Sequence, residues 1–74
     1  MLPEAEPAAL IREMRRRLGM SQNQFARKLG VTFLTVNRWE NGHTRPCSLS
    51  VIQLRRLLRR MGARDLDAQY FLKD

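Results

Sequence analysis

The sequence predicts an all-α fold, a compact bundle of four or five short helices. Apolar residues recur every three or four positions along most of the chain, and no segment alternates apolar and polar residues as a strand does. Two short helices meet around Gly30, which predicts a helix-turn-helix formed by the second and third helices. Glycine tolerates the left-handed conformation of a helix C-terminus, and four glycines divide the pattern at suitable intervals: Gly19, Gly30, Gly42 and Gly62.

The composition indicates a small basic domain. The chain has 74 residues, which suit one domain, and 43% of them are apolar, which is enough for one core. Lys+Arg number 14 against 7 Asp+Glu, giving a net charge of +7, and 12 of the 14 cations are arginine. Because the planar arginine fork matches phosphate groups and guanine edges, this excess favours a nucleic-acid partner. The alternative is an ordinary domain from an arginine-rich proteome.

The composition also argues against several function classes. Cys47 is the single cysteine and His43 the single histidine, so we expect no intrachain disulfide, no metal site and no cofactor. One histidine and seven scattered acids supply no catalytic set, and we expect no enzyme. No apolar run approaches the ~20 residues of a membrane span, and the N-terminus lacks a signal-peptide pattern, so we expect no membrane partner.

The first helix follows an acidic lead-in over residues 1–7, which we expect to be extended. Pro7 fits the first turn of that helix, where a missing N–H costs nothing. Leu10, Met14 and Leu18 then form one apolar face, and Gly19 ends the helix.

The second and third helices have clear end signals. Ser21 and Gln24 have the spacing of a capping box at the start of the second helix, and Gly30 ends that helix. Thr32 is expected to cap the third helix, and Asn41-Gly42 ends it. The predicted core between the two helices is apolar: Phe25, Ala26, Leu29, Val36 and Trp39.

The fourth helix follows a loop over residues 43–47, with Ser48 or Ser50 as its expected cap. Gly62 ends this helix, and Asp65 is expected to cap a last short helix. The fourth helix has an apolar stripe: Val51, Leu54, Leu58 and Met61, widened by Ile52 and Leu57. The last helix has three apolar residues: Leu66, Tyr70 and Phe71.

Four strings near the helix-turn-helix have a specific spacing: Met20-Ser21-Gln22 with Phe25-Ala26, Leu29-Gly30-Val31-Thr32, Val36-Asn37-Arg38-Trp39-Glu40-Asn41-Gly42, and Arg45-Pro46. This pattern resembles the phage-repressor and Cro-like helix-turn-helix family, often called the XRE family. A looser match extends from about Leu10 to Met61. The resemblance implies a lambda-repressor-like fold, with a DNA-binding domain over residues 8–64 and a short C-terminal helix or tail over 65–74.

The resemblance also implies that the third helix, about residues 32–41, enters the major groove of double-stranded DNA. In similar proteins a Gln at the position of Gln22 contacts a phosphate. The expected base-contacting residues lie on the third helix: Thr32, Phe33, Leu34, Thr35, Asn37 and Arg38. The expected phosphate-contacting residues precede or follow it: Arg15, Gln22, Asn41, His43, Thr44 and Arg45.

The sequence departs from the phage repressors at Phe33 and Leu34, where they often carry Gln. Phe and Leu cannot hydrogen-bond a base, so two interpretations follow. Phe33 presses on a thymine methyl while Asn37 and Arg38 supply the hydrogen bonds, or Phe33 and Leu34 dock a protein. For Arg38 we expect guanine O6 and N7, a contact that contributes about 1–3 kcal/mol of discrimination; a phosphate contact is the alternative. Glu40 is expected to be an internal partner of an arginine or a backbone N–H.

The predicted function is sequence-specific DNA binding by a prokaryotic transcriptional regulator that acts as a homodimer, in the cytoplasm on the nucleoid. The alternative is an antitoxin-type or targeting module whose main contact is a partner protein, a toxin or a larger polypeptide; RNA binding is a third hypothesis. Four arginines of the fourth helix face solvent, an acidic partner or a symmetry mate, and the sequence does not choose: Arg55, Arg56, Arg59 and Arg60.

Overall fold

The computed structural model describes residues 7–71, and this part of the chain is all α-helical. Five helices follow one another: α1 (Pro7–Leu18), α2 (Gln22–Leu29), α3 (Phe33–Glu40), α4 (Ser48–Met61) and α5 (Arg64–Tyr70). The predicted all-α fold is thereby confirmed. The expected extended lead-in lies outside the described residues, apart from Pro7, which is the first residue of α1 as expected, and so does the end of the tail beyond Phe71.

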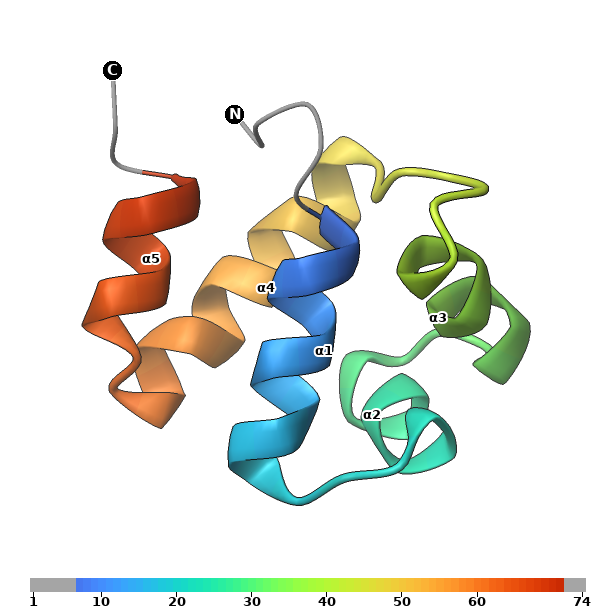
Figure 1. Ribbon diagram of the computed structural model, residues 1–74, viewed down its shortest axis with the longest axis horizontal. Coiled ribbons are helices and arrows are strands. Elements are labelled where there is room, and N and C mark those ends of the chain that lie inside the picture. The colour runs from blue at the N-terminus through green and yellow to red at the C-terminus, as the bar shows by residue number, and fades with distance from the viewer. Residues whose placement is uncertain (1–6, 72–74) are drawn as a thin grey trace.

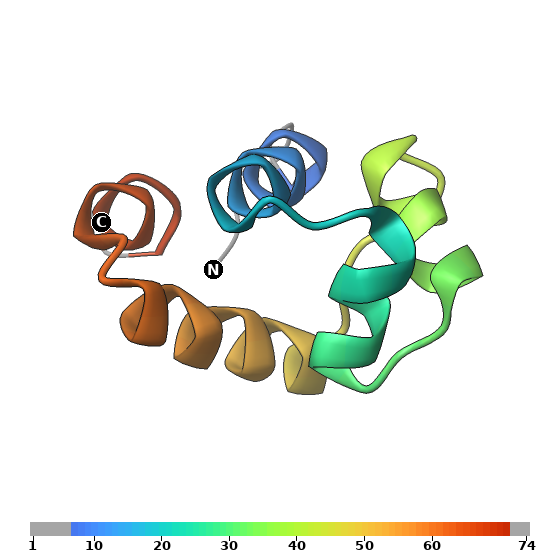
Figure 2. The same ribbon diagram turned by 90° about the horizontal axis from the view of Figure 1, so that it is seen from below.

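The helices form two groups around α1. Figure 1 shows α1 between α5 on one side and the α2–α3 pair on the other. Figure 2, seen from below, shows α4 passing beneath α1 from the α2–α3 pair to α5. α2 and α3 pack on each other, α1 packs on α3, and α5 packs on α4. This arrangement leaves one side of α3 on the outer surface.

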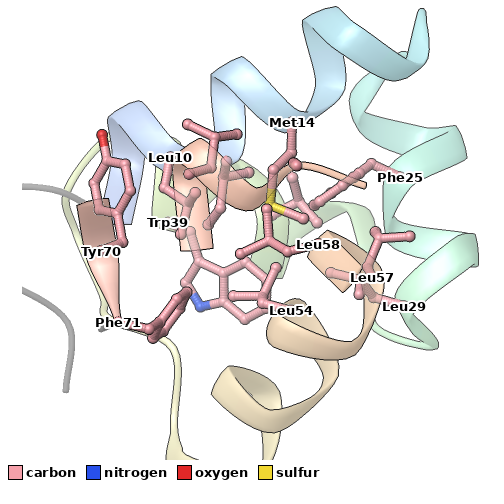
Figure 3. Packing of buried hydrophobic residues seen from close by; sticks show 14 of the residues in the cluster. Leu10, Met14, Phe25, Leu29, Trp39, Leu54, Leu57, Leu58, Tyr70 and Phe71 are labelled. Carbon is pink, nitrogen blue, oxygen red and sulfur yellow. The ribbon is translucent and has the colours of Figure 1, made fainter. Parts of the chain in front are cut away.

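The core lies in the space that these helices enclose (Figure 3). Leu10 and Met14 of α1, Phe25 of α2 and Leu54 and Leu58 of α4 are fully buried. Burial of each such side chain contributes about 1.5–3 kcal/mol, so these contacts hold α2 and α3 in place beside α1 and α4. Tyr70 and Phe71 are labelled beside Leu10 and Trp39 in Figure 3 and close that end of the core.

The predicted helix ends around the turn are confirmed. Ser21 Oγ accepts from the Gln24 N–H at 3.1 Å, and Gln24 Oε1 accepts from the Ser21 N–H at 2.9 Å, which completes the capping box. Gly30 ends α2 with φ 76°, a left-handed conformation that residues with a Cβ atom rarely adopt. Thr32 Oγ1 accepts from the Thr35 N–H at 3.1 Å and caps α3.

Two predicted caps are wrong. α4 begins one residue earlier than expected, with Cys47 as N-cap, and neither Ser48 nor Ser50 caps it; the Cys47 side chain makes no capping hydrogen bond. α5 begins at Arg64 after Ala63, so Asp65 lies inside its first turn. The Asp65 carboxylate instead accepts hydrogen bonds of 2.6 and 2.9 Å from Arg17 of α1.

The predicted stripe of α4 is correct at its centre and wrong at Ile52. Leu54, Leu57 and Leu58 are buried, whereas Ile52 is 51% exposed. Two positions along a helix turn a side chain by about 200°, so Ile52 faces away when Leu54 faces the core. Phe71, expected within the last helix, follows α5 as its C-cap and is still buried.

Candidate nucleic-acid interface

α3 divides its side chains between the core and the surface. Val36 and Trp39 are buried, while Phe33 and Leu34 in the first turn are 47% and 51% exposed. Arg38 is exposed on the same helix. The first turn of α3 therefore presents an apolar pair to the outside, with a cation further along the helix.

Thr32 and Thr35 form a small polar pair at the start of α3. Their hydroxyl oxygens lie 2.9 Å apart, and Thr32 also accepts the backbone N–H of Thr35. Thr32 is exposed and Thr35 is half-buried. The pair fixes the first turn of the helix and keeps hydroxyl groups at its outer end.

Glu40, the last residue of α3, is a buried anion held from α1. Arg15 donates to both carboxylate oxygens, with Nε–Oε2 at 2.6 Å and Nη2–Oε1 at 2.9 Å. Arg12 adds a hydrogen bond of 2.7 Å to the Glu40 carbonyl oxygen. Burial opposes the charge of Glu40, but the hydrogen bonds from Arg15 and Gln22 and the charges of both arginines outweigh it and lower its pKa. The expected internal role of Glu40 is confirmed.

A row of three amides continues from Glu40 toward the surface. Gln22 Nε2 donates to Glu40 Oε1 at 3.1 Å, and Gln22 Oε1 accepts from Asn37 Nδ2 at 3.2 Å. Asn37 Oδ1 in turn accepts from Asn41 Nδ2 at 3.1 Å. We call Gln22, Asn37 and Asn41 the amide row.

The ionised carboxylate fixes the direction of this row. An ionised Glu40 only accepts hydrogen bonds, so Gln22 must turn its NH₂ group inward, and each following amide must then donate toward Gln22. An amide NH₂ group has two hydrogens, and the row uses one from each. Gln22, Asn37 and Asn41 therefore each keep a second N–H, which suits an acceptor such as a phosphate oxygen or adenine N7.

The structure brings most of the predicted contact residues to one region. Gln22, Asn37 and Asn41 lie in the amide row, and the exposed segment after α3 carries three more: His43, Thr44 and Arg45. Arg15 is the exception, because its guanidinium points to Glu40 and to the Met20 carbonyl oxygen, at 3.0 Å from Nη1. Its side chain is 24% exposed.

Sequence reasoning missed two features of this region. Arg12 was not expected to contact Glu40, and the amide row was not expected at all. The four-residue spacing of Asn37 and Asn41 places them on one face of α3 and is the only signal of the row in the sequence. The link from Asn37 to Gln22 joins two helices and needs the packing of α2 on α3 to be known.

The comparison with protein families identifies the family to which this arrangement of helices belongs. A helix-turn-helix family model, HTH_3, matches residues 11–66, from the first turns of α1 into α5. The chain belongs to this family. The XRE/Cro-like resemblance and the lambda-repressor-like fold are thereby confirmed, and the HTH_3 family consists of DNA-binding domains rather than enzymes. DNA is accordingly the partner class that this HTH_3 domain implies.

The other comparisons add no relative. Neither the curated proteins nor the solved structures gave a match to this HTH_3 domain. Among residues 7–71, no helix combines the length and apolarity needed to cross a membrane. Within the same residues, no group of three or more His, Cys, Asp or Glu side chains is placed to hold a metal ion.

Proposed function

We propose that the chain recognises a specific double-stranded DNA sequence, with α3 in the major groove. One observation supports this proposal most directly: the outer side of α3 presents Phe33, Leu34 and Arg38, and the amide row lies beside them. A helix of this length fits the major groove, where each base pair has its own pattern of donors, acceptors and methyl groups.

The proposed base readers divide into two chemical kinds. Arg38 donates both arms of its guanidinium to guanine O6 and N7, and Phe33 and Leu34 pack on thymine methyl groups. Thr32 and Thr35 hydroxyls and the remaining Asn37 N–H reach base edges or the adjacent backbone.

The proposed phosphate contacts flank α3. Gln22 and Asn41 donate their second amide N–H groups, and the exposed segment His43–Arg45 follows the backbone. Arg15 acts indirectly in this proposal, because its guanidinium holds Glu40, and Glu40 orients Gln22. It is a positioning residue.

We further propose that the chain is a prokaryotic transcriptional regulator that works in the cytoplasm as a homodimer on the nucleoid. Two copies related by a two-fold axis would place their α3 helices about 34–36 Å apart, one turn of DNA, so the site would be palindromic. This proposal is supported by the single helix-turn-helix in the described chain, since one α3 covers only a half-site.

Selection of bound duplexes from a random pool tests the proposal. We expect an enriched palindrome whose half-site contains a guanine, and Arg38→Ala should weaken binding by about 1–3 kcal/mol and relax the preference at that base. Arg64→Ala is the matched control, because it removes the same charge from an exposed residue of α5. If the pool shows no enrichment, or if the two variants weaken every duplex equally, α3 does not read sequence.

A second candidate function is an antitoxin-type or targeting module whose main partner is a protein. The exposed Phe33–Leu34 pair is the observation that favours it, because neither side chain can hydrogen-bond a base. Phe33→Ser with Leu34→Ser should then abolish binding of the partner protein that the same operon encodes, while duplex binding persists. Under the DNA-reading proposal the same double variant changes the selected sequence instead.

A further inference from the structure

Every acidic side chain in residues 7–71 is already engaged by an arginine. Arg12 and Arg15 pair with Glu40, and Arg16 and Arg17 pair with Glu13. The two acids of α5 are engaged as well: Asp65 by Arg17 and Asp67 by Arg55. Arg55 also lies 4.9 Å from the ring centre of Phe71. This accounts for one of the four α4 arginines whose role the sequence left open.

Three other cations form no ion pair within residues 7–71, and they meet at one place. Lys28 near the end of α2 lines a shallow hollow with Arg56 and Arg60 of α4. All three side chains belong to exposed residues. Leu29 and Leu57, which are 7% and 5% exposed, and Gln53 complete its lining. We call this hollow the α2–α4 hollow.

The size of the α2–α4 hollow suits a side chain better than a free ligand. Its volume is about 150 Å³, whereas pockets for small molecules and cofactors are about 300–1,000 Å³. Its lining of leucines offers contact to an apolar side chain, and its cations offer contact to carboxylates. An occupant that has both groups is a peptide segment with acidic and apolar residues.

The spacing of the two arginines fits an extended peptide. Arg56 and Arg60 are four residues apart on α4, which separates them by about 6 Å along the helix axis. Alternate side chains on one side of an extended chain are about 6.6 Å apart. Two acidic residues separated by one residue can therefore each meet one arginine, while an apolar residue two positions further along, on the same side of the peptide, enters the hollow.

The position of the α2–α4 hollow separates it from the proposed DNA surface. Lys28 lies at the end of α2 opposite to Gln22, whose amide belongs to the amide row. Figure 2 shows α4 extending away from α3 toward α5, and Arg56 and Arg60 lie in its second half. DNA phosphates have no apolar group to place against Leu29 and Leu57, so the lining favours a protein partner over a second DNA contact.

We propose that the α2–α4 hollow docks an extended acidic segment of a partner protein, with two carboxylates on Arg56 and Arg60, a third near Lys28, and an apolar side chain between the leucines. This proposal does not depend on the sequence preference of α3. It gives the chain a protein contact that remains available while α3 occupies DNA.

Fluorescence anisotropy with a short labelled peptide tests the proposal; its glutamates stand at alternate positions, and its leucine follows two residues after the last of them, on the same side of the extended chain. The test variant is Arg56→Glu with Arg60→Glu, and the matched control is Arg59→Glu with Arg64→Glu, which makes the same charge change on exposed residues outside the hollow. We expect the test variant to bind the peptide about tenfold more weakly than the control, and the wild type to bind a glutamine–leucine peptide about tenfold more weakly than the acidic one. Thermal melts of both variants check that they fold.

Three outcomes would overturn the proposal. Equal loss of peptide binding in the two variants would show attraction to net charge alone. Equal binding of a glutamate–serine peptide would show that the leucine lining has no role. Selective loss of duplex binding in the test variant would assign the hollow to the DNA surface.

Amide chemical-shift mapping gives a second measurement on the unmodified protein. On addition of the acidic peptide we expect the largest shifts at Lys28, Leu29, Gln53, Leu57 and Arg60. Shifts centred on Phe33 and Leu34 instead would place the peptide on α3 and contradict the proposal. A ternary sample with bound duplex should give the same peptide shifts.

Discussion

Replacing Glu40 by glutamine tests whether the buried anion holds α3 on α1. The carboxylate accepts two charge-assisted hydrogen bonds from Arg15, at 2.6 and 2.9 Å. In Glu40→Gln one oxygen becomes an NH₂ group that faces an arginine donor, so one of these hydrogen bonds is lost and the other loses its charge assistance. Hydrogen bonds to charged groups contribute about 1.5–3 kcal/mol each.

The expected cost is the loss of one such bond, about 2 kcal/mol in the free energy of unfolding. A larger cost is not expected, because the Arg15 side chain is 24% exposed and recovers hydration when its partner is gone. For a domain of this size, 1 kcal/mol changes the melting temperature by about 4–8 °C, so Glu40→Gln should lower it by roughly 8–16 °C. Thermal denaturation followed by circular dichroism and by Trp39 fluorescence measures this.

The pH dependence of the same variant gives an internal check. The folded state lowers the pKa of Glu40, so its stabilising effect is complete above the unfolded pKa of about 4.3 and is lost as the pH falls through the folded-state value. The difference in the free energy of unfolding between wild type and Glu40→Gln should therefore be largest at pH 7 and become smaller in acid. Glu13→Gln is the control, because its pairs with Arg16 and Arg17 lie at the surface, where solvent screens them, and they should contribute much less than the buried pair. The reasoning would be refuted if Glu40→Gln were as stable as wild type at pH 7, or if their difference in the free energy of unfolding did not change with pH.

Three further predictions concern packing and charge. Ala26→Leu should cost about 1–3 kcal/mol, because Ala26 is 2% exposed and the added atoms overfill the core; chemical denaturation measures it. Leu54→Ala should cost about 2–5 kcal/mol, whereas Ile52→Asn should change stability by no more than about 0.5 kcal/mol, and a reversed order in the melts would contradict the observed orientation of α4. Hydrogen bonds from arginines lower the pKa of Glu13 and of Asp65 to about 2, so a carboxyl titration by NMR should show both groups ionised at pH 4, with their stabilising effect present above that pH and lost toward pH 2.

The helix-turn-helix could be predicted from the sequence because its signals are local. Ser21 and Gln24 are three residues apart and bond each other within one turn, and Gly30 ends α2 through its own backbone conformation. Neither signal depends on a distant part of the chain. The same holds for Thr32, whose cap is completed by Thr35.

The wrong predictions share a different cause. Asp65 has the chemistry of an N-cap, but Arg17, 48 residues away in the chain, binds its carboxylate. Ile52 fits the apolar pattern of α4, and the sequence allows α4 to face the core with either Ile52 or Leu54. In the structure Leu54 packs in the core, which leaves Ile52 exposed. The phosphate contact expected of Arg15 stays a prediction, and here too the sequence did not reveal the partner, because buried Glu40 accepts the Arg15 guanidinium. Each outcome depends on which elements meet in space, and one sequence without coordinates does not carry that information.

The placement of the acids has a kinetic consequence. Outside buried Glu40, the acids of the described chain lie on α1 and α5, whereas α2, α3 and α4 carry only cations among their exposed charged residues. The exposed surface of α2, α3 and α4 therefore sets no carboxylate against an approaching polyanion. A polyanion attracts this surface over a distance, so its diffusional encounters with these helices are faster than they would be with a neutral surface. Added salt should accordingly lower the association rate constant more than it raises the dissociation rate constant.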